Sequence, residues 1–127
     1  VFFTGDHEPP YNIYAPGDAE YAEYQSFVDE KQASIIQAMR GVDVLIADTS
    51  YTAQEYPAKV GWGHGTFQTS IEAACQAGAK VLYCTHHEPT RSDDALEAAF
   101  AQALADNPVP AGGPEIRLAF EGHSYEF

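Results

Sequence analysis

The chain has 127 residues, enough for one domain, and 45% of them are apolar, which is ordinary for a globular fold. Its formal net charge is −13, with only six Lys and Arg residues. Nucleic-acid binding depends mainly on clustered basic side chains, so this balance argues against a nucleic-acid polymer as partner and suits multivalent cations instead. No apolar run is long enough to span a membrane, so no membrane association is predicted.

The start of the chain and its cysteines bear on where the protein works. The first residues, VFFTGDHEPP, lack the basic region that opens a signal peptide. Cys75 and Cys84 show no CxxC spacing and are expected to be small buried apolar residues in a reducing compartment, which predicts a cytoplasmic protein. Because the chain opens on a strand-like apolar run without Met, we expect a processed chain, a truncated one or half of a longer protein.

Apolar runs and turn residues predict strands that alternate with helices, which is typical of βαβ units and a largely parallel sheet. The predicted strands cover residues 1–4, 42–47, 80–84 and 115–120, and the last residues are expected to add a short edge strand. The predicted helices cover residues 26–40, 67–77 after an N-cap at Thr66, and 93–105 after an N-cap at Ser92. Residues 48–65 form a long irregular stretch around Trp62, a length that favours a functional loop.

Polar side chains follow the ends of three predicted strands. Asp6, Asp48 and His86 each come at or just after a buried strand, and His64 precedes a helix N-terminus. Ligands bind at the carboxyl ends of strands in open α/β sheets, so these side chains are expected at one edge. Carboxylate and imidazole together suit zinc, manganese or iron. Further ligands would come from outside the chain or from the remaining histidines, His7, His87 and His123.

Each of these residues also has a purely structural interpretation. Asp6 and Asp48 are good turn formers, because their side chains can bond to their own backbone. His64 between two glycines can be a plain loop residue, and His86 and His87 can be solvated loop residues.

Three segments in order resemble motifs of the metallo-β-lactamase superfamily, in its tRNase Z-like phosphodiesterase branch. They are TGDHEP at 4–9, VLIADTSY at 44–51 and GWGHGTFQTSIEAACQAGAKVLYCTHHEP at 61–89. The resemblance implies an α/β fold, half of a four-layer αββα arrangement, with a mixed sheet and helices on one face. Residues 1–127 would be the C-terminal half of that domain, because the HxHxDH motif of the N-terminal half is absent. An N-terminal half or a second copy would then pack on the exposed sheet face.

The same resemblance implies roles for individual residues. Asp6 would bridge two divalent metal ions, zinc first and manganese or iron as alternatives, and His86 would bind the second ion. His64 would act as general acid or stabilise the developing oxyanion, with Asp48 orienting its ring. His87 and His7 are candidates for the side chains that support the ligands, although the order of His86 and His87 is left open.

The resemblance therefore predicts a metal-dependent hydrolase, and the acidic surface favours a small or cyclic phosphodiester substrate. The chain alone is expected to be inactive, because most ligands of the first metal are absent. Two alternatives remain: a thioester or lactone hydrolase of the same fold, and a non-catalytic regulatory or assembly domain.

Overall fold

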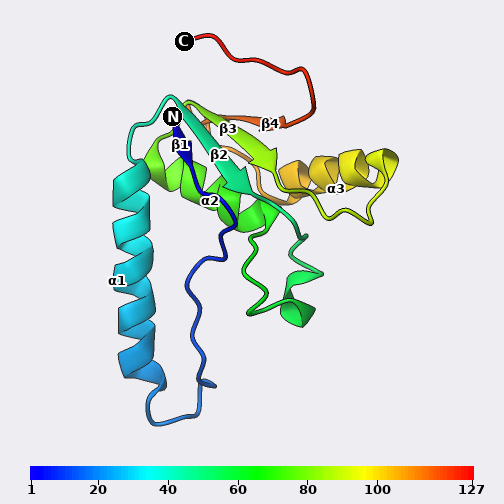
Figure 1. Cartoon of the computed structure of the whole chain (residues 1–127). Helices are drawn as coiled ribbons and strands as arrows, with labels where there is room; N and C mark the ends of the chain where they lie inside the picture. The colour runs from blue at the N-terminus through cyan, green and yellow to red at the C-terminus, as the bar shows by residue number, and fades with distance from the viewer.

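The computed structural model describes residues 1–127 as four strands, three α-helices and one short 3-10 helix (Figure 1). The strands are β1 (Phe2–Phe3), β2 (Val44–Asp48), β3 (Val81–Thr85) and β4 (Glu115–Leu118). The helices are α1 (Tyr21–Met39), η1 (Tyr56–Ala58), α2 (Phe67–Ala77) and α3 (Asp93–Asp106).

The strands form one sheet in the order β1-β2-β3-β4, and every neighbouring pair is parallel. This confirms the predicted α/β class and is compatible with half of a metallo-β-lactamase fold. The sheet is wholly parallel, however, where a mixed sheet was expected, and the last residues add no edge strand. Successive right-handed crossovers put consecutive helices on the same face when strands follow one another in chain order, as they do here.

Helix ends follow the local chemistry of the sequence. Thr66 and Thr69 form a reciprocal capping box at the start of α2, and Gly78 ends that helix in the left-handed conformation, at φ 66°. Helix α1 begins five residues earlier than predicted, at Tyr21. Its added first turn packs against the preceding loop, where the rings of Tyr14 and Tyr24 meet edge to face at 5.4 Å. This contact is tertiary, so helical periodicity gave no sign of it.

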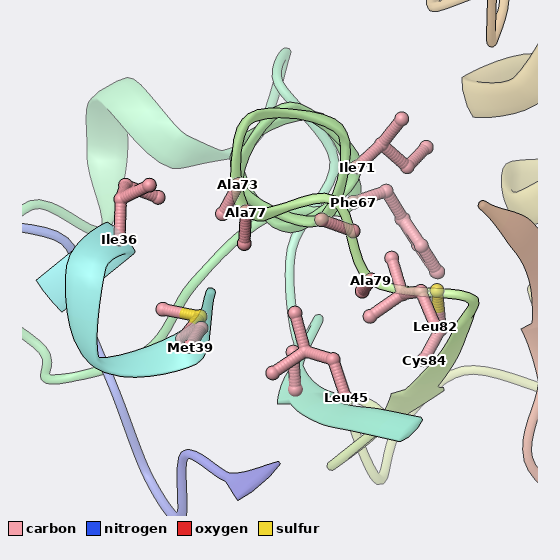
Figure 2. Close-up of a cluster of buried hydrophobic side chains, with 12 residues drawn as sticks. Ile36, Met39, Leu45, Phe67, Ile71, Ala73, Ala77, Ala79, Leu82 and Cys84 are labelled. Carbon is pink, nitrogen blue, oxygen red and sulfur yellow. The ribbon is translucent and has the colours of Figure 1, made fainter. Parts of the chain in front are cut away.

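The main core lies between the sheet and α2 (Figure 2), and α1 and α3 lie on either side of that helix (Figure 1). Leu45 of β2 and Leu82 of β3 are fully buried beneath Phe67 at the start of α2. Burial of one such side chain stabilises the fold by about 1.5–3 kcal/mol. The core therefore fixes β2 and β3, the two strands whose ends carry Asp48 and His86.

The other face of the sheet is less exposed than the sequence led us to expect. Val44, Val81 and Tyr83 on this face are each less than 10% exposed, because Ala119 and Tyr125 of the C-terminal segment pack against them. The segment after β4 thus covers part of the apolar surface that a half domain would leave open.

The loops that follow β1 and β2 leave the sheet at its carboxyl edge, and the N-terminal half of α1 extends past the same edge (Figure 1). Candidate functional residues that lie far apart in sequence come together there. None of the helices is both long and apolar enough to cross a membrane.

We expect the two cysteines to differ in reactivity. Cys84 is fully buried in β3, and burial raises the pKa of its thiol to about 12, whereas Cys75 is partly exposed. Maleimide should therefore label native protein at Cys75 alone, and both residues after unfolding. A Cys75→Ser variant provides the control, since its native form should take no label. Labelling of that native variant at the rate of the unfolded chain would contradict the burial of Cys84.

Candidate metal centre

The carboxylate of Asp48, at the end of β2, is the fully buried centre of the site. Its Oδ2 accepts hydrogen bonds from the backbone N–H of His7, at 3.1 Å, and from Nδ1 of His64, at 2.7 Å. Its Oδ1 accepts from the backbone N–H and the hydroxyl of Ser50, at 3.1 and 2.8 Å. Four donors thus replace the water that burial removes from this charge.

His64 is oriented by this carboxylate. The short contact to Asp48 places the ring proton on Nδ1, which leaves Nε2 free on the other side of the ring. The side chain is 22% exposed, so it lies at the boundary between the interior and solvent. A ring held in this way can pass a proton at Nε2 without losing its orientation.

Gly65 allows the His64 loop to lie against β2. A Cβ at this position would be 2.7 Å from the backbone O of Asp48 and 3.0 Å from that of His7. Both contacts are with backbone, so neither neighbour can easily move aside. The glycine is therefore required for the close approach that brings His64 to the carboxylate.

Asp6 and His86 form the exposed side of the site. Oδ1 of Asp6 lies 3.1 Å from Nε2 of His86, and the two side chains are 69% and 45% exposed. His86 follows β3 in the left-handed region, at φ 56°, and is the one non-glycine residue of the chain with positive φ. That conformation is costly for a side chain with a Cβ and turns the ring back toward the loop after β2.

Together these residues form one cluster. A ligand atom from each of Asp6, Asp48, His64 and His86 lies within 4.8 Å of the others, and the two imidazole rings stack at 4.5 Å. Both oxygens of Asp48 are engaged by hydrogen bonds. The donor atoms that remain free are a carboxylate oxygen of Asp6 and Nε2 of His86, with Nε2 of His64 beside them, and such oxygen and imidazole donors suit zinc or a similar divalent ion.

The two remaining candidates face elsewhere. His7 contributes its backbone N–H to Asp48, and burial lowers the pKa of its imidazole below the ordinary value, partly offset by the charge of Asp48. Nε2 of His87 lies 3.2 Å from the carbonyl O of Ala119, which ties the loop to the C-terminal segment. The sequence left open whether His86 or His87 is the candidate ligand, and in the structure His86 is the one that faces the cluster.

Sequence reasoning missed Glu8, which holds the loop that carries His64. Its carboxylate accepts hydrogen bonds from the Tyr56 hydroxyl and the Gly61 N–H, both at 2.8 Å, and from the Gly63 N–H at 2.9 Å. Burial and this contact raise the pKa of Tyr56, so its hydroxyl remains a donor. The TGDHEP segment thus supplies both Asp6 and the anchor of the His64 loop.

A second group of hydrogen bonds, after those of Glu8, joins the loops that follow β2 and β3. The Arg91 guanidinium donates to both oxygens of Glu55, at 2.6 and 2.8 Å, and to the backbone O of Ser50 at 3.5 Å. Arg91 is buried in this position. Nothing in the sequence pairs these two residues, which lie 36 positions apart.

The chain was compared with known proteins by sequence and by structure. It is 24% identical to a ribonuclease Z of Brevibacillus brevis over 104 residues, which is 82% of this chain and 30% of that protein. It is 32% identical to ribonuclease Z of Saccharolobus islandicus over 60 residues, 47% of this chain and 20% of the relative. No family model and no solved structure matches.

The chain is therefore related to ribonuclease Z, which confirms the relation expected from the three motifs. It spans less than a third of the length of these relatives.

The comparison corrects the expectation that a nucleic-acid polymer is an unsuitable partner. The relatives are named as ribonucleases, so their substrate is a nucleic acid. The prediction was wrong because it used the net charge of one segment, −13, as if it described a whole binding surface. Divalent ions supply positive charge locally, and most of each relative lies beyond the matched segment.

We predict that Gly65→Ala displaces the His64 loop. The new methyl group meets two backbone oxygens, and such overpacking costs about 1–3 kcal/mol of unfolding free energy. Denaturant unfolding measures the loss, with Gly17→Ala as control, since a Cβ there meets nothing within 4 Å. Equal stability of the two variants would rule out the close packing.

We predict that Glu8→Ala loosens the loop at 56–63. Loss of the acceptor leaves the Gly61 and Gly63 amides without partners, so their hydrogen exchange should quicken at least about tenfold. Glu30→Ala is the matched control, because that exposed carboxylate lies on α1 away from the loop. Unchanged exchange at both glycines in the Glu8 variant would show that the loop does not depend on this anchor.

Proposed function

We propose that this chain belongs to a metal-dependent hydrolase that cleaves phosphodiester bonds. The observation that carries the proposal is the Asp6–His86 pair beside a histidine oriented by buried Asp48. Relation to ribonuclease Z supports the same reaction class, since a ribonuclease hydrolyses phosphodiesters.

Asp6 and His86 are the residues that would hold the metal. Both side chains reach solvent, and their donor atoms are the borderline type that zinc, manganese and iron accept. Bound divalent ions would stabilise charge on the phosphoryl oxygens and activate water for attack.

His64 is proposed as the general acid. Its Nδ1 proton is held by Asp48, so the charge of the protonated ring is balanced by a buried carboxylate 2.7 Å away. Nε2 then presents a proton to the alkoxide that leaves phosphorus. General acids positioned in this way typically contribute about 10²–10⁴ in rate.

The donors in this chain are fewer than two metal ions require. A catalytic zinc usually has three protein ligands, whereas Asp6 and His86 provide two. We therefore propose that residues 1–127 form the C-terminal half of the catalytic domain and that the remaining ligands lie outside them. On this proposal the 127-residue chain alone has little or no activity.

The relatives favour RNA as the substrate, because each is named as a ribonuclease. A small phosphodiester, the expectation from the acidic surface, is the second candidate. Bis-p-nitrophenyl phosphate and RNA assayed side by side on the complete protein separate the two, and a thioester substrate tests the alternative reaction.

We predict that His64→Ala in the complete protein lowers kcat for phosphodiesters about 10²–10⁴-fold and leaves zinc affinity nearly unchanged. The reason is that His64 acts on the leaving group, whereas Asp6 and His86 bind the metal. His123→Ala is the control, since that ring stacks on Phe120 away from the cluster. Full activity of the His64 variant, or a complete protein that binds no divalent metal, would overturn the proposal.

A further inference from the structure

We propose that Ser50 is a positioning residue that fixes the tautomer and orientation of His86, so that Nε2 is the metal-binding nitrogen. The metal role of His86 rests on the function proposed above, but the tautomer does not. Ser50 is buried, and its hydroxyl lies within hydrogen-bond distance of three groups. They are Oδ1 of Asp48 at 2.8 Å, the carbonyl O of His86 at 2.6 Å and Nδ1 of His86 at 2.9 Å.

Proton counting decides between the two neutral forms of the ring. A serine hydroxyl has one proton to donate, and neither neighbouring oxygen carries one. If Ser50 donated to Nδ1 of His86, its oxygen would face both a carboxylate and a carbonyl oxygen, at 2.8 and 2.6 Å, with no proton in either contact.

The other arrangement reduces this conflict. Ser50 shares its single proton between these two oxygens and accepts a proton from Nδ1 of His86, so the ring contact is complementary and the oxygen contacts have one proton in place of none. The proton of the neutral ring then lies on Nδ1, and Nε2 keeps its lone pair. That lone pair faces Oδ1 of Asp6 at 3.1 Å, and two acceptors so close together are stabilised by a shared cation.

The backbone contact gives Ser50 a second effect. His86 is the one non-glycine residue with positive φ, an unfavourable conformation that persists only where the surrounding structure holds it. The hydrogen bond from Ser50 to the His86 carbonyl, together with the ring contact, holds that turn at two points.

Asp48 and Ser50 therefore orient both rings of the cluster. Asp48 uses Oδ2 for His64 and Oδ1 for Ser50, and Ser50 carries the orientation on to His86. The two stacked imidazoles are tied to one buried carboxylate, one directly and one through a hydroxyl.

The test measures the ring itself, without any activity. Long-range ¹H–¹⁵N spectra of the full chain at pH about 8, where an ordinary imidazole is neutral, show which nitrogen carries the proton. Signals of His86 are identified by their loss in a His86→Ala variant. We expect the Nδ1–H form in the unmodified chain and in Ser50→Thr, which keeps the hydroxyl, and a mixture of tautomers in Ser50→Ala.

Ser70→Ala is the matched control, because Ser70 is also buried and its hydroxyl also bonds to Asp48, but at the backbone O. It should leave the His86 tautomer unchanged. In the complete protein, titration with Zn²⁺ alone should show about 10–100-fold weaker binding for Ser50→Ala than for Ser70→Ala.

Two results would overturn the proposal: an Nε2–H tautomer in the unmodified chain, or a Ser50→Ala variant that matches Ser70→Ala in both tautomer and zinc affinity. If Ser50→Ala does not fold, Ser50→Thr decides, since a mixed tautomer in that variant contradicts the role of the hydroxyl. Failure of the hydrolase proposal gives a different set of results. In that case the spectra still show the Nδ1–H form of His86, but the complete protein binds no metal or cleaves no phosphodiester.

Discussion

The buried carboxylate of Asp48 is the constraint on which the site depends. A buried charge without partners costs several kcal/mol, so the chain must deliver donors to it from wherever they lie. They come from the segment after β1, the His64 loop and the turn at Ser50. The stability of these loops and the geometry of the site are therefore coupled, because a loop that moves away from Asp48 removes part of the hydrogen bonding that stabilises its buried charge.

The parallel sheet places these segments within reach of one another. Asp48 pairs in register with Thr85, so His86 begins the next loop directly beside it. Asp6 follows β1 on the other side of β2. Burial of Leu45 and Leu82 fixes β2 and β3 in the core. The polar residues at the ends of these strands therefore owe their positions to the core and not to their own contacts alone.

Much of this was accessible from sequence, since it depends on local pattern and topology. Apolar runs identified β2 and β3, Thr66 and Gly78 marked the ends of α2, and residues at strand ends were expected at one edge. The roles of Asp6 and His86 as ligands and of His64 as acid remain predictions. The parallel character of every strand pair was only partly predicted, because a half-domain resemblance suggested a mixed sheet.

Contacts between loops could not be predicted from the sequence, for a physical reason. Ser50, Glu8 and Arg91 act through hydrogen bonds to residues 36 to 55 positions away, and no periodicity or spacing encodes such pairs. His86, which has positive φ, faces the cluster and His87 does not, and the two adjacent histidines in the sequence do not reveal that turn. The charge argument failed because composition does not say where charges lie or what the rest of a larger protein contributes.

The hydrogen bonds of Glu8 and of the Arg91–Glu55 pair also limit how such a site can vary in sequence. Glu8 ties the loop after β1 to the loop after β2, and Arg91 with Glu55 ties that loop to the one after β3. The shape of each loop is therefore encoded partly in its neighbours, so a loop grafted alone from a relative would arrive without its supports. Substitutions at these positions should consequently change together across the three loops, because a change in one partner leaves the other without its hydrogen bonds.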